Sequence, residues 1–403
     1  MASTPTQTDA ANQPTATSTG SLLVSLPPLP NGALDTMLLN LAGAFPSRTV
    51  LVATPMATQN GEAHAKPDNI HLVPYTPAAT STTSWVLTAA DFLNNFTAAQ
   101  QSHASACLLL GAECQSLSPE AIRSLAASIT TSSADLAVAH YNLGSREGLV
   151  NSAILYPVTR ALFCVRPRYP LAIDLGLSLR MAERLAAVAQ KFISINQTDA
   201  LLWPAAEAAS ANYMIAEVDV GARMLPQPAA ADLNSLLAQV GGSLFSEVDA
   251  KAAFWQRARG TQPAHPFTLS ALPAEGPDIA PMLDAFRLAY TNLHEIWSLV
   301  LPPNSLLGLK RLSITPADSF HMPDNLWARI VYDFALAYRL RTINRGHLLG
   351  ALTPLYLAWV ASHLVLTSSG TPPEKHIQDL AAAFETDKPY LVSRWRWPDR
   401  FNP

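Results

Sequence analysis

Short apolar runs alternate with segments of helical spacing over residues 21–140, and this alternation restricts the fold more than any other feature of the sequence. The segments 35–44 and 85–101 carry apolar residues at helical spacing, and Ser118-Pro119-Glu120 has the residue types of a helix start. The apolar runs have the length and composition of buried strands; they lie at 22–26, 49–53, 71–74, 107–110 and 135–139. This order predicts an α/β fold, with a mostly parallel, Rossmann-like sheet and helices on both of its faces.

Ligands of such sheets bind at the carboxyl ends of the strands. The candidate site therefore lies around Pro27, 54–61, 111–114 and 140–146. His140 comes just after a predicted strand, and it is a candidate acid or base because its side chain titrates near neutral pH. A polar loop residue without a chemical role is the other interpretation of His140.

The rest of the chain is predicted to be largely helical. Helices are expected at 145–163, 179–192 and 204–216, with a loop at 169–178. From residue 232 onward the pattern is helical, interrupted by proline-rich loops at 263–281 and 302–323. Residues 1–20 are rich in Thr, Ser, Ala, Gln and Pro, which is typical of a disordered tail. We therefore expect a tail at 1–20, an α/β domain at 21–230 and a helical region at 231–403.

Composition excludes several classes of protein. Hydrophobic residues make up 49% of the chain and charged residues 14%, so the chain can bury a large core. A net charge of −4 provides no basic surface for nucleic acid. The first 20 residues lack the pattern of a signal peptide, and three cysteines are too few for a disulfide scaffold, so a cytoplasmic location is expected.

One long apolar stretch raises the question of a membrane span. Residues 346–373 contain no Asp, Glu, Lys or Arg, but Thr353, Pro354, Ser362 and His363 interrupt the apolar residues. A spanning helix needs about 20 predominantly apolar residues. A buried helix within the helical region is therefore the favoured interpretation.

Two neighbouring segments are distinctive. Residues 151–162 read Asn-Ser-Ala-Ile-Leu-Tyr-Pro-Val-Thr-Arg-Ala-Leu, and residues 169–178 read Tyr-Pro-Leu-Ala-Ile-Asp-Leu-Gly-Leu-Ser. They resemble the glucosyl- and mannosyl-3-phosphoglycerate synthase group of glycosyltransferases, in which a similar Tyr-Pro-x-Thr-Arg helix precedes a loop ending in Asp/Glu-Phe-Gly-Phe-Ser. Residues 326–334 and 352–357 resemble the tail of bacterial members. The resemblance implies a GT-A fold for the first domain, and retaining transfer of a sugar from a nucleotide donor.

The sequence departs from this group at the positions that should bind the donor. The group has an Asp-x-Asp motif after the central strand, and its carboxylates hold the Mg²⁺ or Mn²⁺ that bridges the donor phosphates. Here the motif is degenerate: Gly111-Ala112-Glu113 leaves Glu113 as the one candidate metal ligand, and a solvent-facing strand end is its other interpretation. Four further features are missing, namely an acidic turn at 54–61, a Gly-Lys-Gly-like segment at 81–85, a metal-binding His near 224–226 and an acidic residue near 201–203, although Asp199 is close.

Two functions remain open. The joint losses favour a divergent relative with weak or lost transferase activity, a pseudoenzyme that binds or scaffolds a protein partner or a second copy of itself. The alternative is an active hexosyltransferase that moves a sugar from a nucleotide donor to a small polar or phosphorylated acceptor such as a glycerate derivative. For an active enzyme the predicted residues are catalytic Asp174 and His140, substrate-binding Asn151, Arg160 and Arg180, and metal-binding Glu113. Structural roles are the other interpretation of Asn151 and Arg160.

Overall fold

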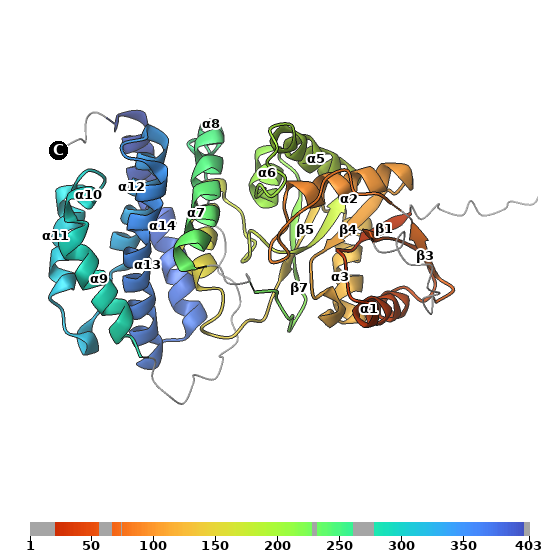
Figure 1. Cartoon of the computed structure of the whole chain (residues 1–403), viewed down its shortest axis with the longest axis horizontal. Helices are drawn as coiled ribbons and strands as arrows, with labels where there is room; N and C mark the ends of the chain where they lie inside the picture. The colour runs from red at the N-terminus through yellow and green to blue at the C-terminus, as the bar shows by residue number, and fades with distance from the viewer. Residues whose placement is uncertain (1–20, 56–66, 74, 228–231, 261–277, 399–403) are drawn as a thin grey trace, which may run out of the picture.

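The computed structural model describes residues 21–55, 67–73, 75–227, 232–260 and 278–398. The tail predicted at 1–20 lies outside these residues, as does most of the loop predicted at 263–281. Figure 1 shows a sheet region and a bundle of helices side by side. The predicted α/β class with a helical C-terminal region is therefore confirmed.

Seven strands from the described residues form one sheet in the order β3-β2-β1-β4-β6-β5-β7. Every neighbouring pair is parallel except those of β6, which runs antiparallel to both β4 and β5. The central strands β1 and β4 are buried along their whole length, which explains why the sequence shows continuous apolar runs there. The strands are β1 (Leu22–Ser25), β2 (Val50–Ala53), β3 (Ile70–Val73), β4 (Ala106–Leu110), β5 (Leu136–His140), β6 (Asp174–Ser178) and β7 (Ile215–Asp219).

Two of these strands correct the prediction. β6 occupies the end of the predicted loop at 169–178. The helix predicted at 204–216 ends at Ser210, and β7 begins at Ile215. Gly176 belonged to the predicted loop, but it lies inside β6, where a Cβ atom would come within 3.1 Å of the Ala137 side chain and the Leu125 carbonyl. The glycine therefore reflects close packing within the sheet region and not a turn.

Helices cover both faces of the sheet (Figure 1). α1 (Asn31–Ala44) packs against α3 (Pro119–Thr130) on one face, and α2 (Ala89–Gln101) packs against α5 (Leu179–Ile193) on the other. The predicted start of α3 is confirmed, because the Ser118 side chain accepts a hydrogen bond from the Ala121 N–H at 3.2 Å. A short helix, α6 (Pro204–Ser210), leads toward β7.

The helical region is built around one apolar helix. α13 (Arg345–Ser368) is the only helix among the described residues long and apolar enough to cross a membrane, and 78% of its most apolar window is buried. It packs against α7, α9 and α12, so burial within the bundle accounts for its composition. The prediction of a loop at 302–323 is wrong in its first half, because α11 (Pro303–Ser313) lies there. The other helices are α7 (Leu233–Ala250), α8 (Ala252–Trp255), α9 (Ala280–Asn292), α10 (His294–Ser298), α11 (Pro303–Ser313), α12 (Asp324–Leu340) and α14 (Pro373–Arg396).

The segment predicted as one helix at 145–163 is more irregular. It begins as a π-helical turn, η3 (Asn151–Leu155), and continues as α4 (Tyr156–Phe163), which packs against α14. Pro157 has no N–H to donate to the Ala153 carbonyl one turn earlier. The Trp327 indole N–H on α12 donates to that carbonyl instead, at 2.8 Å. Proline therefore frees a carbonyl that links this segment to the helical region.

Candidate functional site

Two adjoining cavities open at the carboxyl edge of the sheet. The first, here the strand-end cleft, has a volume of about 710 Å³ and is lined by the residues that follow β1 and β4, by the segment 75–87 and by the start of α2. The second, here the apolar cavity, has a volume of about 440 Å³ and is lined by residues that follow β5 and β7, by η3 and by α7. Val86 and Ile173 line both. The predicted location of the site, at the carboxyl ends of the strands, thus contains both cavities.

The strand-end cleft carries hydroxyl groups but no cation among its described lining residues. Hydroxyl groups dominate the segment Thr80–Ser84, and no Lys, Arg or His contributes to the wall. The one carboxylate, that of Asp91, accepts hydrogen bonds at 2.8 Å from both the N–H and the hydroxyl of Thr88, and so caps α2. Burial raises the pKa of Asp91. A nucleoside diphosphate would find no positive side chain on this wall.

The segment 81–83 beside the strand-end cleft is held by an acidic residue. The carboxylate of Asp199 accepts hydrogen bonds from the Thr82 N–H at 2.8 Å and from the Thr82 hydroxyl at 2.6 Å. The Ser81 hydroxyl lies 3.3 Å from the same carboxylate. Asp199 therefore fixes the segment around Ser81 and Thr82.

A buried ion pair lies between the two cavities. The Arg223 Nε is 2.9 Å from the Asp174 Oδ2, and both side chains have no exposed surface. The guanidinium also donates to the Glu113 carbonyl at 2.6 Å and to the Ala112 carbonyl at 2.7 Å. Burial opposes the charge of Arg223, but the carboxylate of Asp174 outweighs burial and raises the pKa of Arg223. The pair is therefore charged and internally neutralised.

Tyr141 completes this cluster. Its hydroxyl donates to the Asp174 Oδ2 at 3.2 Å and accepts from the Ile173 N–H at 3.0 Å. Burial raises the pKa of Tyr141 well above its ordinary value, so the phenol stays protonated. All the strong partners of Asp174 are thus internal to the protein.

The surroundings of Glu113 do not fit a divalent cation. The Glu113 side chain accepts a hydrogen bond from Gln115 at 2.7 Å, and its backbone is left-handed with φ of 61°. Arg223 already occupies the Ala112 and Glu113 carbonyls and the Asp174 carboxylate. Among the described residues, no group of three or more His, Cys, Asp or Glu side chains is placed to hold a metal ion.

Gly111 is tightly packed at the position where the resemblance places the first carboxylate of the motif. A Cβ atom built on Gly111 would lie 2.7 Å from the Cβ of Ile173. Real carbon atoms do not approach so closely, so a side chain at this position requires Ile173 to move. The packing of Ile173 against the end of β4 therefore excludes an aspartate at 111 in this arrangement.

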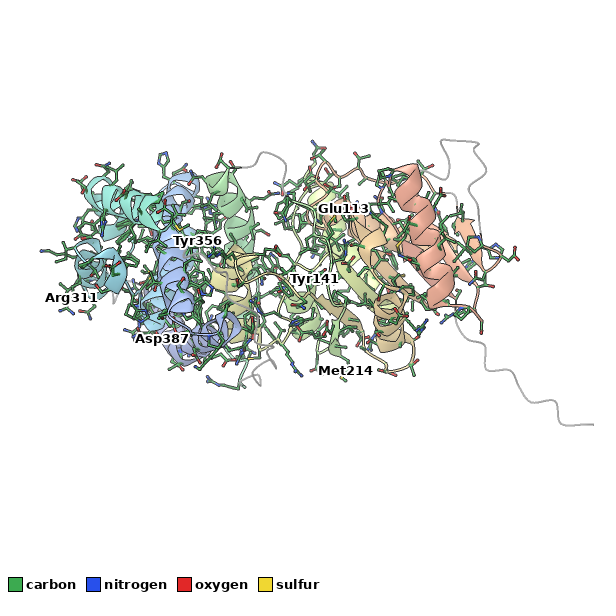
Figure 2. All side chains as sticks on the ribbon, turned by 90° about the horizontal axis from the view of Figure 1, so that it is seen from below. Glu113, Tyr141, Met214, Arg311, Tyr356 and Asp387 are labelled. Atoms are coloured by element: carbon green, nitrogen blue, oxygen red, sulfur yellow. The ribbon has the colours of Figure 1, made fainter. Side chains whose placement is uncertain are left out.

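His140 and Arg180 lie outside the described lining of both cavities. The Nδ1 of His140 is 3.2 Å from Glu217, at the edge of the sheet formed by β5 and β7. Arg180 forms an ion pair with Asp135, which also accepts from the Met214 N–H at 2.9 Å. Met214 lies at the end of the sheet away from Glu113 (Figure 2). Because β6 is antiparallel to its neighbours, its carboxyl end lies at the end of the sheet opposite the cavities. Arg180 follows β6 directly and therefore lies at that end.

Asn151 and Arg160 have internal partners. Asn151 lines the apolar cavity, but its amide donates to the Arg168 carbonyl at 3.0 Å. Arg160 is buried between α4 and α14, where its Nε is 2.9 Å from Glu385 and its Nη1 is 2.6 Å from Gln378. Both residues therefore hold backbone or helices together, and their roles in substrate binding remain predictions.

The sequence reasoning missed Arg223. The residue follows β7, and β7 itself was not predicted, since a helix was expected up to residue 216. The alternation of acidic residues with valines over 217–220 was a signal for a strand. A strand there would have placed Arg223 at the carboxyl edge of the sheet, beside Asp174.

Several solved structures are similar to this chain. Glucosyl-3-phosphoglycerate synthase from Mycobacterium tuberculosis, in complex with Mn²⁺, UDP and glucosyl-3-phosphoglycerate, is 15% identical with a TM-score of 0.37, and the match covers 59% of this chain and 86% of that one. Mannosyl-3-phosphoglycerate synthase from Rubrobacter xylanophilus is 12% identical with a TM-score of 0.39, over 60% of this chain and 79% of that one. No protein-family model and no curated protein matches the sequence. These two structural neighbours belong to the group that the sequence resembles.

Proposed function

We propose that this protein is a glycosyltransferase-like protein that has lost nucleotide-sugar transfer and acts by binding a ligand or a protein partner, in the cytoplasm. The observation that carries the proposal is the position of Arg223. Its guanidinium is fully buried against Asp174 and the two carbonyls at the end of β4, the oxygens that a divalent cation would need. A permanent internal cation there removes both the metal site and the charge that a leaving diphosphate requires.

The strand-end cleft supports the same proposal. Transfer without a metal ion needs basic side chains to offset the charge of the diphosphate. No Lys, Arg or His is among the described lining residues of the cleft, and Arg223 has no exposed surface from which to reach a phosphate. Both routes to stabilisation of the diphosphate are therefore missing from the described residues.

Isothermal titration tests the proposal directly. The purified full chain is titrated with UDP, GDP and ADP and with their sugars, with and without Mn²⁺. Glucosyl-3-phosphoglycerate synthase from Mycobacterium tuberculosis, whose solved structure contains UDP and Mn²⁺, serves as the positive control. We expect no heat of binding from this protein under conditions in which the control binds UDP.

Micromolar, metal-enhanced binding of one nucleotide would overturn the proposal. It would favour the alternative, an active transferase, and would identify the base of the donor. Circular dichroism of the same sample shows that the protein is folded, so that absence of binding is informative.

A further inference from the structure

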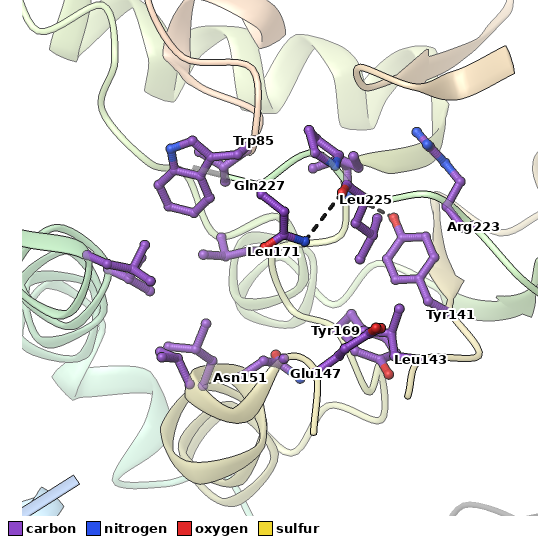
Figure 3. Close-up of a pocket in the computed structure, with 18 of the residues that line it drawn as sticks. Trp85, Tyr141, Leu143, Glu147, Asn151, Tyr169, Leu171, Arg223, Leu225 and Gln227 are labelled. Carbon is purple, nitrogen blue, oxygen red and sulfur yellow. Dashed lines mark hydrogen bonds between the residues drawn. The ribbon is translucent and has the colours of Figure 1, made fainter. Parts of the chain in front are cut away.

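Side chains from the sheet region and from α7 of the helical region line the apolar cavity (Figure 3). Trp85 precedes α2, Tyr141 follows β5, and Leu236 and Val240 belong to α7. Its volume of about 440 Å³ falls in the range of small-molecule sites, which is roughly 300–1,000 Å³. The cavity is therefore large enough to enclose a ring compound.

Aromatic and aliphatic side chains form most of its wall. Tyr141 and Tyr169 are neighbours, with ring centroids 5.1 Å apart and planes tilted by 54°. Trp85 lies across the cavity from them (Figure 3). Aromatic faces favour flat or ring-bearing ligands over extended polar ones.

The charges on the wall disfavour an anion. Arg223 and Glu147 are the charged residues among the described lining. The Arg223 side chain is neutralised by Asp174 and has no exposed surface, whereas Glu147 is exposed. A phosphate or carboxylate on the ligand would meet Glu147 without a compensating cation, so a neutral or cationic ligand is favoured.

Two polar side chains in the lining, those of Glu147 and Gln227, are available to orient a ligand. The Gln227 side chain lies on the opposite side of the cavity from Glu147 (Figure 3). Its amide makes one long hydrogen bond, 3.4 Å, to the Leu225 carbonyl. Glu147 and Gln227 together offer acceptors to a hydroxyl or amino group that lies between them.

We propose that the apolar cavity binds a small ring compound that is neutral or cationic, with its ring among Trp85, Tyr141 and Tyr169 and a hydroxyl or amino group toward Glu147 and Gln227. The inference rests on the proposed function, since an active transferase of the resembling group would hold a phosphorylated acceptor instead.

Three probes that share one ring and differ in charge test the inference. Tryptophol is neutral, tryptamine is cationic and indole-3-acetate is anionic. Saturation-transfer NMR on the full chain detects millimolar binding of each, and 3-phosphoglycerate is measured by competition. We expect binding of tryptophol and tryptamine, and none of indole-3-acetate or 3-phosphoglycerate.

Two matched variants locate the binding. Leu171→Trp fills the cavity and is expected to weaken tryptophol binding about tenfold or more. Leu288→Trp makes the same change on α9 at a side chain that is 64% exposed and remote from the cavity, and is expected to change nothing. Glu147→Gln is expected to weaken tryptamine more than tryptophol, because it removes the carboxylate and keeps the shape.

The results separate this inference from the proposed function. Preferred binding of indole-3-acetate or 3-phosphoglycerate, binding unaffected by Leu171→Trp, or no binding of any probe would overturn the inference. Nucleotide binding in the titration described above would overturn the proposed function instead, whatever the probes do.

Discussion

Replacing Arg223 by methionine should destabilise the protein strongly. The substitution keeps much of the length and apolar volume of the side chain but removes its charge. Asp174 then retains a carboxylate with no exposed surface and loses the partner at 2.9 Å. The Tyr141 hydroxyl and the Gly111 N–H remain as its neutral donors.

The size of the effect follows from burial. Removal of one partner from a buried ion pair costs about 3–5 kcal/mol, because an uncompensated charge remains. The Ala112 and Glu113 carbonyls also lose a donor, but both residues are half-buried beside the strand-end cleft, where water can replace it. We therefore expect the free energy of unfolding to fall by ~4 kcal/mol.

A second substitution shows whether the unpaired charge is the cause. Asp174→Leu combined with Arg223→Met leaves no buried charge, and apolar replacements of buried pairs are often neutral or stabilising. We expect the double variant to recover more than half of the loss, and a double-mutant cycle to give a coupling energy of ~2 kcal/mol or more.

Urea unfolding followed by circular dichroism measures these differences. Lys375→Met is the matched control, because Lys375 and Asp379 form an ion pair on α14 in which both side chains are 54% exposed. That control should cost less than about 0.5 kcal/mol. A loss below about 1 kcal/mol for Arg223→Met, or a double variant no more stable than the single one, would refute the reasoning.

Two further substitutions test other buried charges. Burial raises the pKa of Glu247 from 4.5 to about 7. The folded state therefore holds this proton more tightly than the unfolded state, and the free energy of unfolding falls as the pH rises from 4.5 to about 7. Glu247→Gln should remove up to about 3 kcal/mol of that decline, measured by unfolding at pH 5 and pH 8; an unchanged pH dependence would contradict the assignment. Arg160→Met should lower the free energy of unfolding by ~3 kcal/mol, because it removes the buried ion pair with Glu385 and the hydrogen bond to Gln378 that join α4 to α14. It should leave tryptophol binding intact, whereas lost binding at unchanged stability would favour the predicted substrate-binding role.

Much of the sheet region could be predicted because its signals are local. The continuous apolar runs of β1 and β4 are typical of strands that are covered by helices on both faces. Ser118 and Pro119 are residue types that favour a helix start, and α3 begins there. β6 could not be predicted in this way. Gly176 has the same local meaning in a turn and in a crowded strand, and only the approach of Ala137 and Leu125 distinguishes the two.

The candidate site likewise depends partly on local sequence and partly on long-range packing. The sequence alone predicted a degenerate Asp-x-Asp motif and indicated that the candidate site lies at the carboxyl ends of the strands. Only the tertiary structure decided that Arg223, 49 residues away from Asp174 in the chain, neutralises it. Arg160 and Glu385 are separated by 225 residues, and their pairing likewise depends on how α4 meets α14. Local patterns indicate strands, helices and missing motifs. The partner of a buried charge is set by long-range packing, because the charge loses its water only when distant segments of the chain pack around it.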